Sequence, residues 1–76
     1  MVKFKLENGY YLYKLGDILK EKNISINKLE KATNTDFKII KKYISGEIMR
    51  PDIFVLARFC DYLDCDITDI IEYKRK

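Results

Sequence analysis

Residues 25–46 constrain the fold of this chain more strongly than any other segment. Their sequence, SINKLEKATNTDFKIIKKYISG, contains two short stretches with the hydrophobic spacing of helices, separated by residues 33–36. Ser25 and Asp36 precede these stretches and can cap them, because their side-chain oxygens accept hydrogen bonds from free backbone N–H groups. Gly46 ends the second stretch as a left-handed cap. The segment therefore predicts two short helices joined by a tight turn.

The two predicted helices differ in what they present to solvent. The first ends at Asn34, which tolerates a positive φ, and is expected to bury Leu29 and Ala32. The second runs from about Phe37 to Ser45. Its inward side comprises Ile40, Tyr43 and Ile44, and its outward side comprises Lys38, Lys41 and Lys42. Two helices arranged in this way form a helix-turn-helix, in which the second helix lies in the major groove of DNA.

The N-terminal segment has the period of a β-strand, because residues 2–6 alternate apolar side chains with lysines. Asn8-Gly9 follows as a turn signal. Three interpretations are open: a short strand that leads into a helix, an edge strand paired with a second subunit, or a hairpin closed by residues 10–13. We favour the short strand. Helical spacing then predicts a helix over about Tyr11–Lys22, with Asn23 as its C-terminal stop.

The second half of the chain predicts two more helices. Pro51 cannot lie inside a helix, and Asp52 is expected to cap a helix over about Ile53–Leu63. Asp66 caps a final short helix, with Asp69 in the capping-box position. The expected buried side chains are Ile53, Leu56, Phe59, Cys60 and Leu63 in the longer helix and Ile67, Ile70 and Ile71 in the shorter one.

Together these elements predict an all-α fold of five helices, with a short N-terminal β-strand as an optional addition. The length corresponds to one domain, residues 1–76, in which residues 1–10 form an N-terminal extension and residues 74–76 are expected to fray. No apolar run approaches the ~20 residues that a membrane span needs. The N-terminus also lacks the apolar core of a secretion signal. We therefore expect a cytoplasmic protein.

The sequence offers little support for catalysis or metal binding. It contains no histidine, no Gly-rich phosphate loop and no nucleophile beside a base. Cys60 and Cys65 are expected to be reduced thiols, since no export signal precedes them, and one pair of cysteines does not make a zinc site. We expect no cofactor and no small-molecule ligand, and a protein that is not an enzyme.

Positive charge is concentrated in the first 50 residues, the part of the chain that holds the helix-turn-helix. The net charge of the whole chain is +3. Residues 1–50 carry eleven Lys and Arg against six Asp and Glu, a net charge of +5, whereas residues 51–76 carry four against six, a net charge of −2. An uneven field of this kind suits a protein that presents one face to phosphate. The alternative is an ordinary lysine-rich surface, which charge alone does not exclude.

Aromatic residues gather near the N-terminus, where Tyr10, Tyr11 and Tyr13 follow Phe4. They have two interpretations: they cover the end of a small core, or they form a dimer interface, where aromatic residues are enriched. Further apolar residues without an obvious place in the core are Ile48, Met49 and Phe54. Together these residues favour self-association.

The order and spacing of the residues from Leu15 to Tyr73 resemble the Cro and phage-repressor-type helix-turn-helix family, also called the XRE family. The residues that carry the resemblance are Leu15, Ile18-Leu19, Asn23-Ile24-Ser25, Leu29, Thr33-Asn34, Ile40, Gly46, Pro51, Leu56 and the closing FCDYLDCDITDIIEY. That closing segment is similar to a subgroup of short stand-alone regulators.

This resemblance implies a DNA-binding transcriptional regulator with a repressor-like fold, usually a homodimer that reads a near-palindromic operator. Two half-sites would then lie about 34 Å apart. The DNA contacts that it implies are Phe37, Lys38, Lys41 and Lys42 in the second helix of the motif, Ile26 at the start of the first, and Ser45, Gly46, Glu47 and Arg50 in the loop that follows. Ser25 is expected to cap the first helix, and its backbone is a further candidate for a phosphate contact. Phe37 has an alternative interpretation as a core anchor.

Four residues depart from the family pattern, and they motivate a rival function. Ile26 replaces a residue that is commonly polar in the family, and Glu30 replaces one that is commonly small. Ile39 replaces a residue that is commonly Ser or Thr, and Glu47 replaces one that is commonly basic. They make the expected DNA face more apolar and less basic. The rival is a protein–protein interaction module that retains the fold and has lost specific operator binding.

Overall fold

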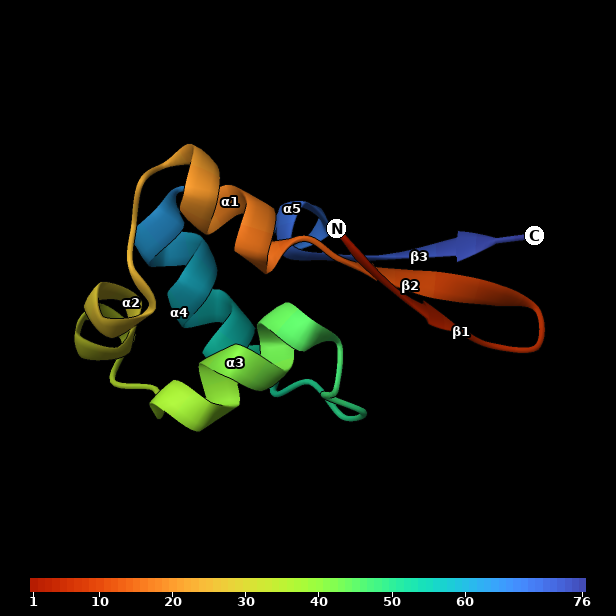
Figure 1. Ribbon diagram of the computed structural model, residues 1–76, viewed down its shortest axis with the longest axis horizontal. Helices are drawn as coiled ribbons and strands as arrows, with labels where there is room; N and C mark the ends of the chain where they lie inside the picture. The colour runs from red at the N-terminus through yellow and green to blue at the C-terminus, as the bar shows by residue number, and fades with distance from the viewer.

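The computed structural model describes residues 1–76 and combines a helical body with a small sheet that projects from it (Figure 1). In chain order the elements are β1 (Val2–Lys5), β2 (Gly9–Tyr13), α1 (Leu15–Glu21), α2 (Ile26–Thr33), α3 (Phe37–Ser45), α4 (Ile53–Leu63), α5 (Ile67–Ile70) and β3 (Ile71–Arg75). None of the helices is long and apolar enough to span a lipid bilayer.

The sheet corrects the predicted all-α fold. Its three strands are antiparallel in the order β1-β2-β3, so the two ends of the chain pair with the central strand β2. Residues 10–13 close a hairpin with β1, so the favoured short strand is wrong, and the helix predicted from Tyr11 begins only at Leu15. Aromatic side chains at residues 10, 11 and 13 favour strand over helix because they pack well on a pleated surface. The tail expected to fray belongs to β3 up to Arg75.

Gly9 shows why the hairpin fits against the C-terminal strand. It is the first residue of β2, directly after the turn, and pairs with Arg75 on β3. A Cβ atom at this position would collide with the backbone oxygen of Lys74 and lie 2.7 Å from the hydroxyl oxygen of Tyr73. Only glycine allows β3 to approach this closely.

The core lies among the helices, with α4 running through the body of the molecule (Figure 1). Ten side chains form the buried cluster: Leu15, Leu19, Leu29, Ile40, Tyr43, Val55, Leu56, Phe59, Leu63 and Ile70. Tyr43 and Phe59 meet edge to face at its centre, with ring centroids 5.4 Å apart. The prediction that Ala32, Ile53 and Ile67 belong to the core is wrong, because all three residues are exposed. Thr33 and Val55 are buried instead, each at i, i+4 spacing from a core residue that the prediction placed correctly, Leu29 and Phe59.

Most of the predicted caps are confirmed. Ser25 accepts a hydrogen bond from the Lys28 N–H at 3.1 Å, and Asp52 accepts one from the Phe54 N–H at 2.8 Å. The carboxylate of Asp69 accepts from the backbone N–H of Asp66 at 2.9 Å, as in a capping box. These bonds satisfy donors that a helix N-terminus otherwise leaves free.

The sheet is fixed to the C-terminal end of α3. Tyr13 is buried, and its hydroxyl donates a hydrogen bond to the carbonyl oxygen of Ile48 at 2.8 Å. Gly46, with φ of 81°, packs so closely that an added Cβ would lie 3.1 Å from Val2 and 3.2 Å from Tyr13. The base of the sheet and the loop after α3 therefore form one packed unit.

The Tyr13 hydroxyl can be tested by Tyr13→Phe, which removes the donor and leaves the Ile48 carbonyl without this partner. The variant should lose about 1 kcal/mol of unfolding free energy, as expected for one hydrogen bond. Urea denaturation measures the change. The control is Tyr10→Phe, on the opposite face of the sheet beneath Lys3, which should stay within about 0.5 kcal/mol of the wild type. Equal losses in both variants would contradict the role of the hydrogen bond.

Alkaline pH should destabilise the protein through its thiols. Burial raises the pKa of Cys60, and burial likewise raises the pKa of Cys65 to about 11. An unfolded chain loses these protons from about pH 8.5, so stability is complete below that pH and falls as the pH rises towards the folded-state pKa values. Urea midpoints at pH 7 and pH 9.5 measure the loss. The double variant Cys60→Ala/Cys65→Ala should show a smaller decrease relative to its own value at pH 7, and an equal decrease would contradict this cause.

Candidate nucleic-acid interface

The turn between α2 and α3 is closed by buried hydroxyls. Asn34 takes the left-handed conformation, with φ of 50°, as predicted. The Thr33 hydroxyl donates to the carbonyl oxygen of Leu29 at 2.7 Å, and the Thr35 hydroxyl donates to the carbonyl oxygen of Thr33 at 3.2 Å. Arg58 reaches across from α4 and donates from Nε to the same Thr33 carbonyl at 2.9 Å. These bonds fix the direction in which α3 leaves the turn.

The start of α3 has two acidic acceptors. Asp36 caps the helix as predicted, since its carboxylate accepts from the Lys38 N–H at 2.8 Å. Glu30, on α2, accepts from the Phe37 N–H at 3.2 Å. A carboxylate near a helix N-terminus also interacts favourably with the helix dipole. Glu30 thus has a structural role, although in the sequence it was only a departure from the family pattern.

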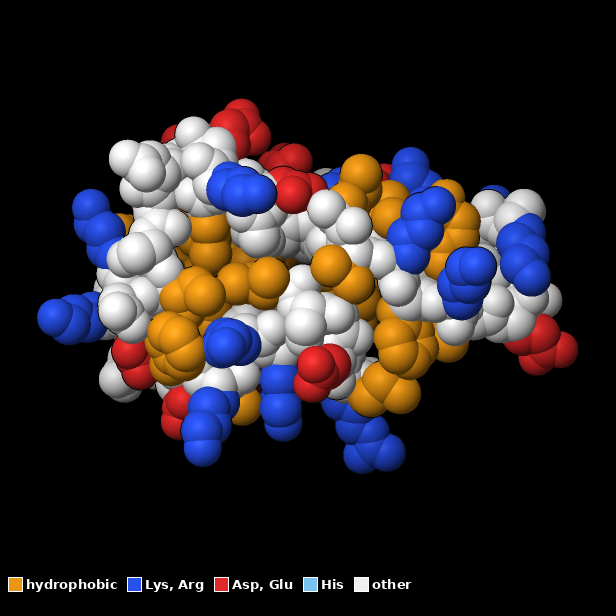
Figure 2. All heavy atoms as spheres, viewed as in Figure 1, with side chains coloured by type: hydrophobic (Ala, Val, Ile, Leu, Met, Phe, Trp, Pro, Cys, Tyr) orange, Lys and Arg blue, Asp and Glu red, His pale blue; other side chains and the backbone are white.

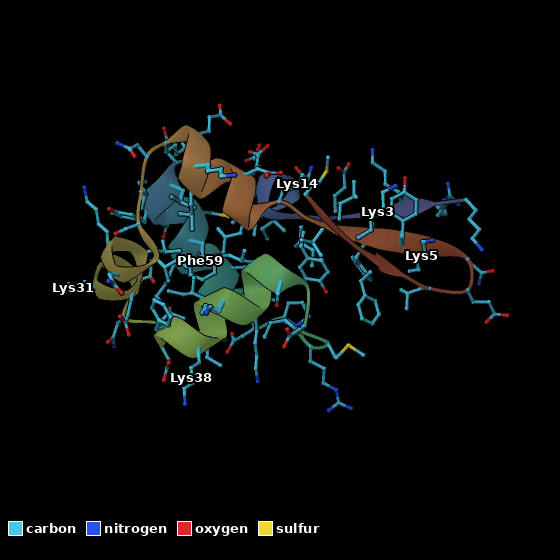
Figure 3. All side chains as sticks on the ribbon, viewed as in Figure 1. Lys3, Lys5, Lys14, Lys31, Lys38 and Phe59 are labelled. Carbon is cyan, nitrogen blue, oxygen red and sulfur yellow. The ribbon has the colours of Figure 1, made fainter.

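The outward face of α3 carries the predicted lysines together. Lys38, Lys41, Lys42 and Ser45 follow the spacing of one helix face, are all exposed, and border one shallow depression with Glu47. Figure 3 shows Lys38 projecting from α3 away from the helical body, and Figure 2 shows basic side chains along this edge of the molecule. The three ion pairs of the protein involve Asp17 and Glu72, so these lysines have no acidic partner. The face therefore offers three lysines without ion-pair partners to a ligand, beside the single carboxylate of Glu47.

Phe37 lies at the start of α3, where it contacts a lysine of the outward face. The side chain is half-buried at the start of α3, and its ring lies beneath the ammonium group of Lys41, 5.6 Å from the centroid. An arrangement of this type is a cation–π interaction. Phe37 thus packs against the protein and also holds a lysine of the outward face.

The start of α2 is less accessible than the sequence implied. Ser25 is exposed and caps the helix, but Ile26 is half-buried and packs against the core. Ser25, Ile26 and Lys28 line an open groove together with residues of the N-terminus and α1, among them Met1, Val2, Gly16 and Lys20. The departures at Ile26 and Ile39 are explained by packing, since both side chains lie against the core.

The loop after α3 mixes polar and apolar groups. Ser45 donates from its hydroxyl to the carbonyl oxygen of Lys42 at 3.4 Å, and Arg50 is exposed. Ile48 packs against the core, whereas Met49 projects into solvent. Sequence reasoning found the lysines through their helical period. It missed Glu30, Thr33, Thr35 and Arg58, for which the sequence carries no local signal.

The bond from Phe37 to Glu30 predicts a difference between two substitutions. Glu30→Ala removes the acceptor and should cost about 1 kcal/mol of unfolding free energy. Glu30→Gln keeps an acceptor oxygen in the same place and should cost less than Glu30→Ala. Urea denaturation of both variants measures the ranking, and a Gln variant as unstable as the Ala variant would contradict the role of this oxygen.

Comparison with known proteins agrees with this geometry. Residues 14–76 match the Cro/C1-type HTH DNA-binding domain family. Among solved structures, the fold is similar to the crystal structure of the transcriptional regulator VanUg in Form II, with a TM-score of 0.70 and 26% sequence identity over 96% of each chain. A search among proteins of curated function finds no match. The chain therefore belongs to the Cro/C1-type helix-turn-helix DNA-binding family.

Proposed function

We propose that this protein is a sequence-specific DNA-binding transcriptional regulator, repressor-like in kind, in which residues 1–76 act as one domain. The observation that carries the proposal is the outward face of α3. Lys38, Lys41 and Lys42 are exposed on one side of a helix whose start is braced by Asp36 and Glu30. A rigid helix with unpaired ammonium groups is suited to the major groove, where base edges offer hydrogen-bond acceptors.

The side chains of this face have different roles in the proposal. Lys38, near the helix start, contacts a guanine edge, while Lys41 and Lys42 contact a base or the backbone. Ser45 and Arg50 contact phosphate from the end of α3 and the loop after it. The backbone at Ser25 and Ile26 approaches a second phosphate at the start of α2. Phe37 contributes through Lys41, whose ammonium it supports.

The protein would act as a homodimer on a near-palindromic operator. Two copies of α3 would enter successive major grooves, with half-sites about 34 Å apart. Neutralised phosphates supply much of the affinity, and α3 supplies the specificity. The protein would then act in the compartment that holds the DNA. From the sequence, we expect this compartment to be the cytoplasm.

The alternative is a protein-interaction module that has lost operator reading. Glu47 is the residue that favours it, because its carboxylate borders the same depression as the lysines and opposes phosphate. The other three departures from the family pattern give the interaction module less support, because they have structural roles. Glu30 caps α3, and Ile26 and Ile39 pack against the core.

Selection of binding sites from a random DNA pool tests the proposal. The wild type should enrich a dyad-symmetric sequence. The double variant Lys38→Ala/Lys42→Ala should bind that sequence more weakly. The slope of log affinity against log salt should become shallower by about 0.9 for each phosphate that the variant no longer neutralises.

The matched control is Lys31→Ala, which removes one exposed lysine from α2 that projects in a different direction (Figure 3). Its affinity and salt slope should equal those of the wild type. If selection enriches no sequence, or if the Lys31 control weakens binding as much as the α3 variant, specific reading by α3 is wrong and the interaction module is favoured.

A further inference from the structure

The two faces of the sheet have opposite chemical character. In the strand register, Phe4, Tyr11 and Tyr73 lie side by side across the three strands on one face. The rings of Tyr11 and Tyr73 are tilted against each other, with centroids 5.1 Å apart. Lys3 and Lys5 alternate with Phe4 along β1, so their side chains occupy the other face. Figure 3 shows both lysines on the side of the sheet that faces the viewer.

The aromatic face borders an apolar hollow of this small protein. The hollow lies between the hairpin and the loop after α3, and its lining residues are Phe4, Leu6, Tyr11, Tyr13, Ile48, Met49 and Pro51. Its two walls are held together by the hydrogen bond from Tyr13 to the Ile48 carbonyl. The hollow is therefore part of a fixed surface, which exists before anything binds.

An apolar side chain projects from the edge of this hollow. Met49 is 71% exposed, and Leu6, Tyr11 and Tyr73 are 43%, 36% and 41% exposed. We call the surface made by Phe4, Leu6, Tyr11, Met49 and Tyr73 the aromatic patch. It combines a cavity with a projecting apolar group that is suited to fill such a cavity.

We propose that the aromatic patch binds a second copy of this chain, with Met49 of each copy entering the hollow of the other. A two-fold dimer uses the same patch on both subunits, so the patch must be complementary to itself. A hollow and a projecting methionine on one surface meet this condition. Methionine also adapts its shape to irregular apolar gaps and packs favourably against aromatic rings.

The charge distribution supports a second copy docked face to face. The chain carries a net charge of +3, and two copies must meet where this charge is absent. The five residues of the aromatic patch are uncharged, and the charged side chains that border it are Arg75, two residues beyond Tyr73 on the same face of β3, and Arg50, next to Met49. Pairing two β1 strands edge to edge in antiparallel fashion would instead place Lys3 of one copy near Lys5 of the other. Like charges on an edge strand oppose such pairing. Association through the face avoids this repulsion.

The exposed apolar area of four patch residues supplies about half of what a stable dimer buries per partner. Taking a large side chain as about 200 Å², the exposed fractions of Leu6, Tyr11, Met49 and Tyr73 amount to on the order of 400 Å². An apolar patch of this size lies within the range of the largest patch on a typical monomeric protein, which is often functional. A stable interface buries about 800 Å² per partner, and the partly exposed groups around the hollow extend the patch towards that value.

The position of the patch connects it with DNA reading, and in this respect the inference rests on the proposed function. Met49 lies in the loop that leaves α3, next to Arg50 and four residues after Ser45. Because Tyr13 and Gly46 fix this loop to the sheet, docking of two patches would also fix the two α3 helices relative to each other. The interface would thus set the spacing of the half-sites.

Sedimentation equilibrium of the full chain without DNA tests the interface. The wild type should be dimeric, and Met49→Glu should raise the dimer dissociation constant at least tenfold, because each interface would enclose two carboxylates. The matched control is Ile67→Glu, which adds the same charge at an exposed apolar residue on α5. Its dissociation constant should equal that of the wild type. Circular dichroism confirms that each variant is folded.

A wild type that stays monomeric at 100 μM or more, or a Met49→Glu variant that dimerises as well as the control, would overturn the proposal. DNA binding separates this failure from failure of the proposed function. Met49→Glu should keep binding to a single half-site while losing the gain in affinity from two adjacent half-sites. Lys38→Ala/Lys42→Ala should dimerise normally and bind neither DNA.

Discussion

The hydrogen bonds that close the turn between α2 and α3 are the constraint on which the rest of this structure depends. The Thr33 carbonyl accepts from Arg58 on α4, and Glu30 holds the first N–H of α3. These bonds tie the turn to the helix that carries Phe59 at the centre of the core. With its start held in this way, α3 buries Ile40 and Tyr43 and turns its lysines outward. A looser turn would leave the same side chains without a common direction.

Features set by neighbouring residues could be predicted from the sequence, and features set by distant ones could not. Asn34, Asp36 and Gly46 were placed correctly because capping depends on a few adjacent backbone groups. The sheet was missed because β3 gains its pairing only from β2, about sixty residues earlier in the chain. A short C-terminal segment without its partner has no local reason to form a strand, so it resembled a frayed tail.

The same distinction between neighbouring and distant residues holds for the candidate site. The period of α3 placed Lys38, Lys41 and Lys42 on one face, since helical geometry alone relates them. The roles of Glu30, Ile26 and Ile39 depend on which neighbours cover them, and the sequence does not contain that information. They were therefore interpreted as weakening the DNA face, when the structure gives them capping and packing roles. Residues that support a binding surface are harder to identify than residues that form it.

The pairing of both chain ends with one central strand has a consequence for synthesis. The N-terminus emerges from the ribosome first, so β1 and β2 can pair while most of the helices are still being synthesised. The sheet gains its third strand only after Arg75 has emerged, and the Lys14–Glu72 ion pair, with its atoms 2.8 Å apart, also forms late. Until then one edge of β2 is open to other unfinished chains. Emergence of residues 71–75 is therefore the step that closes the sheet.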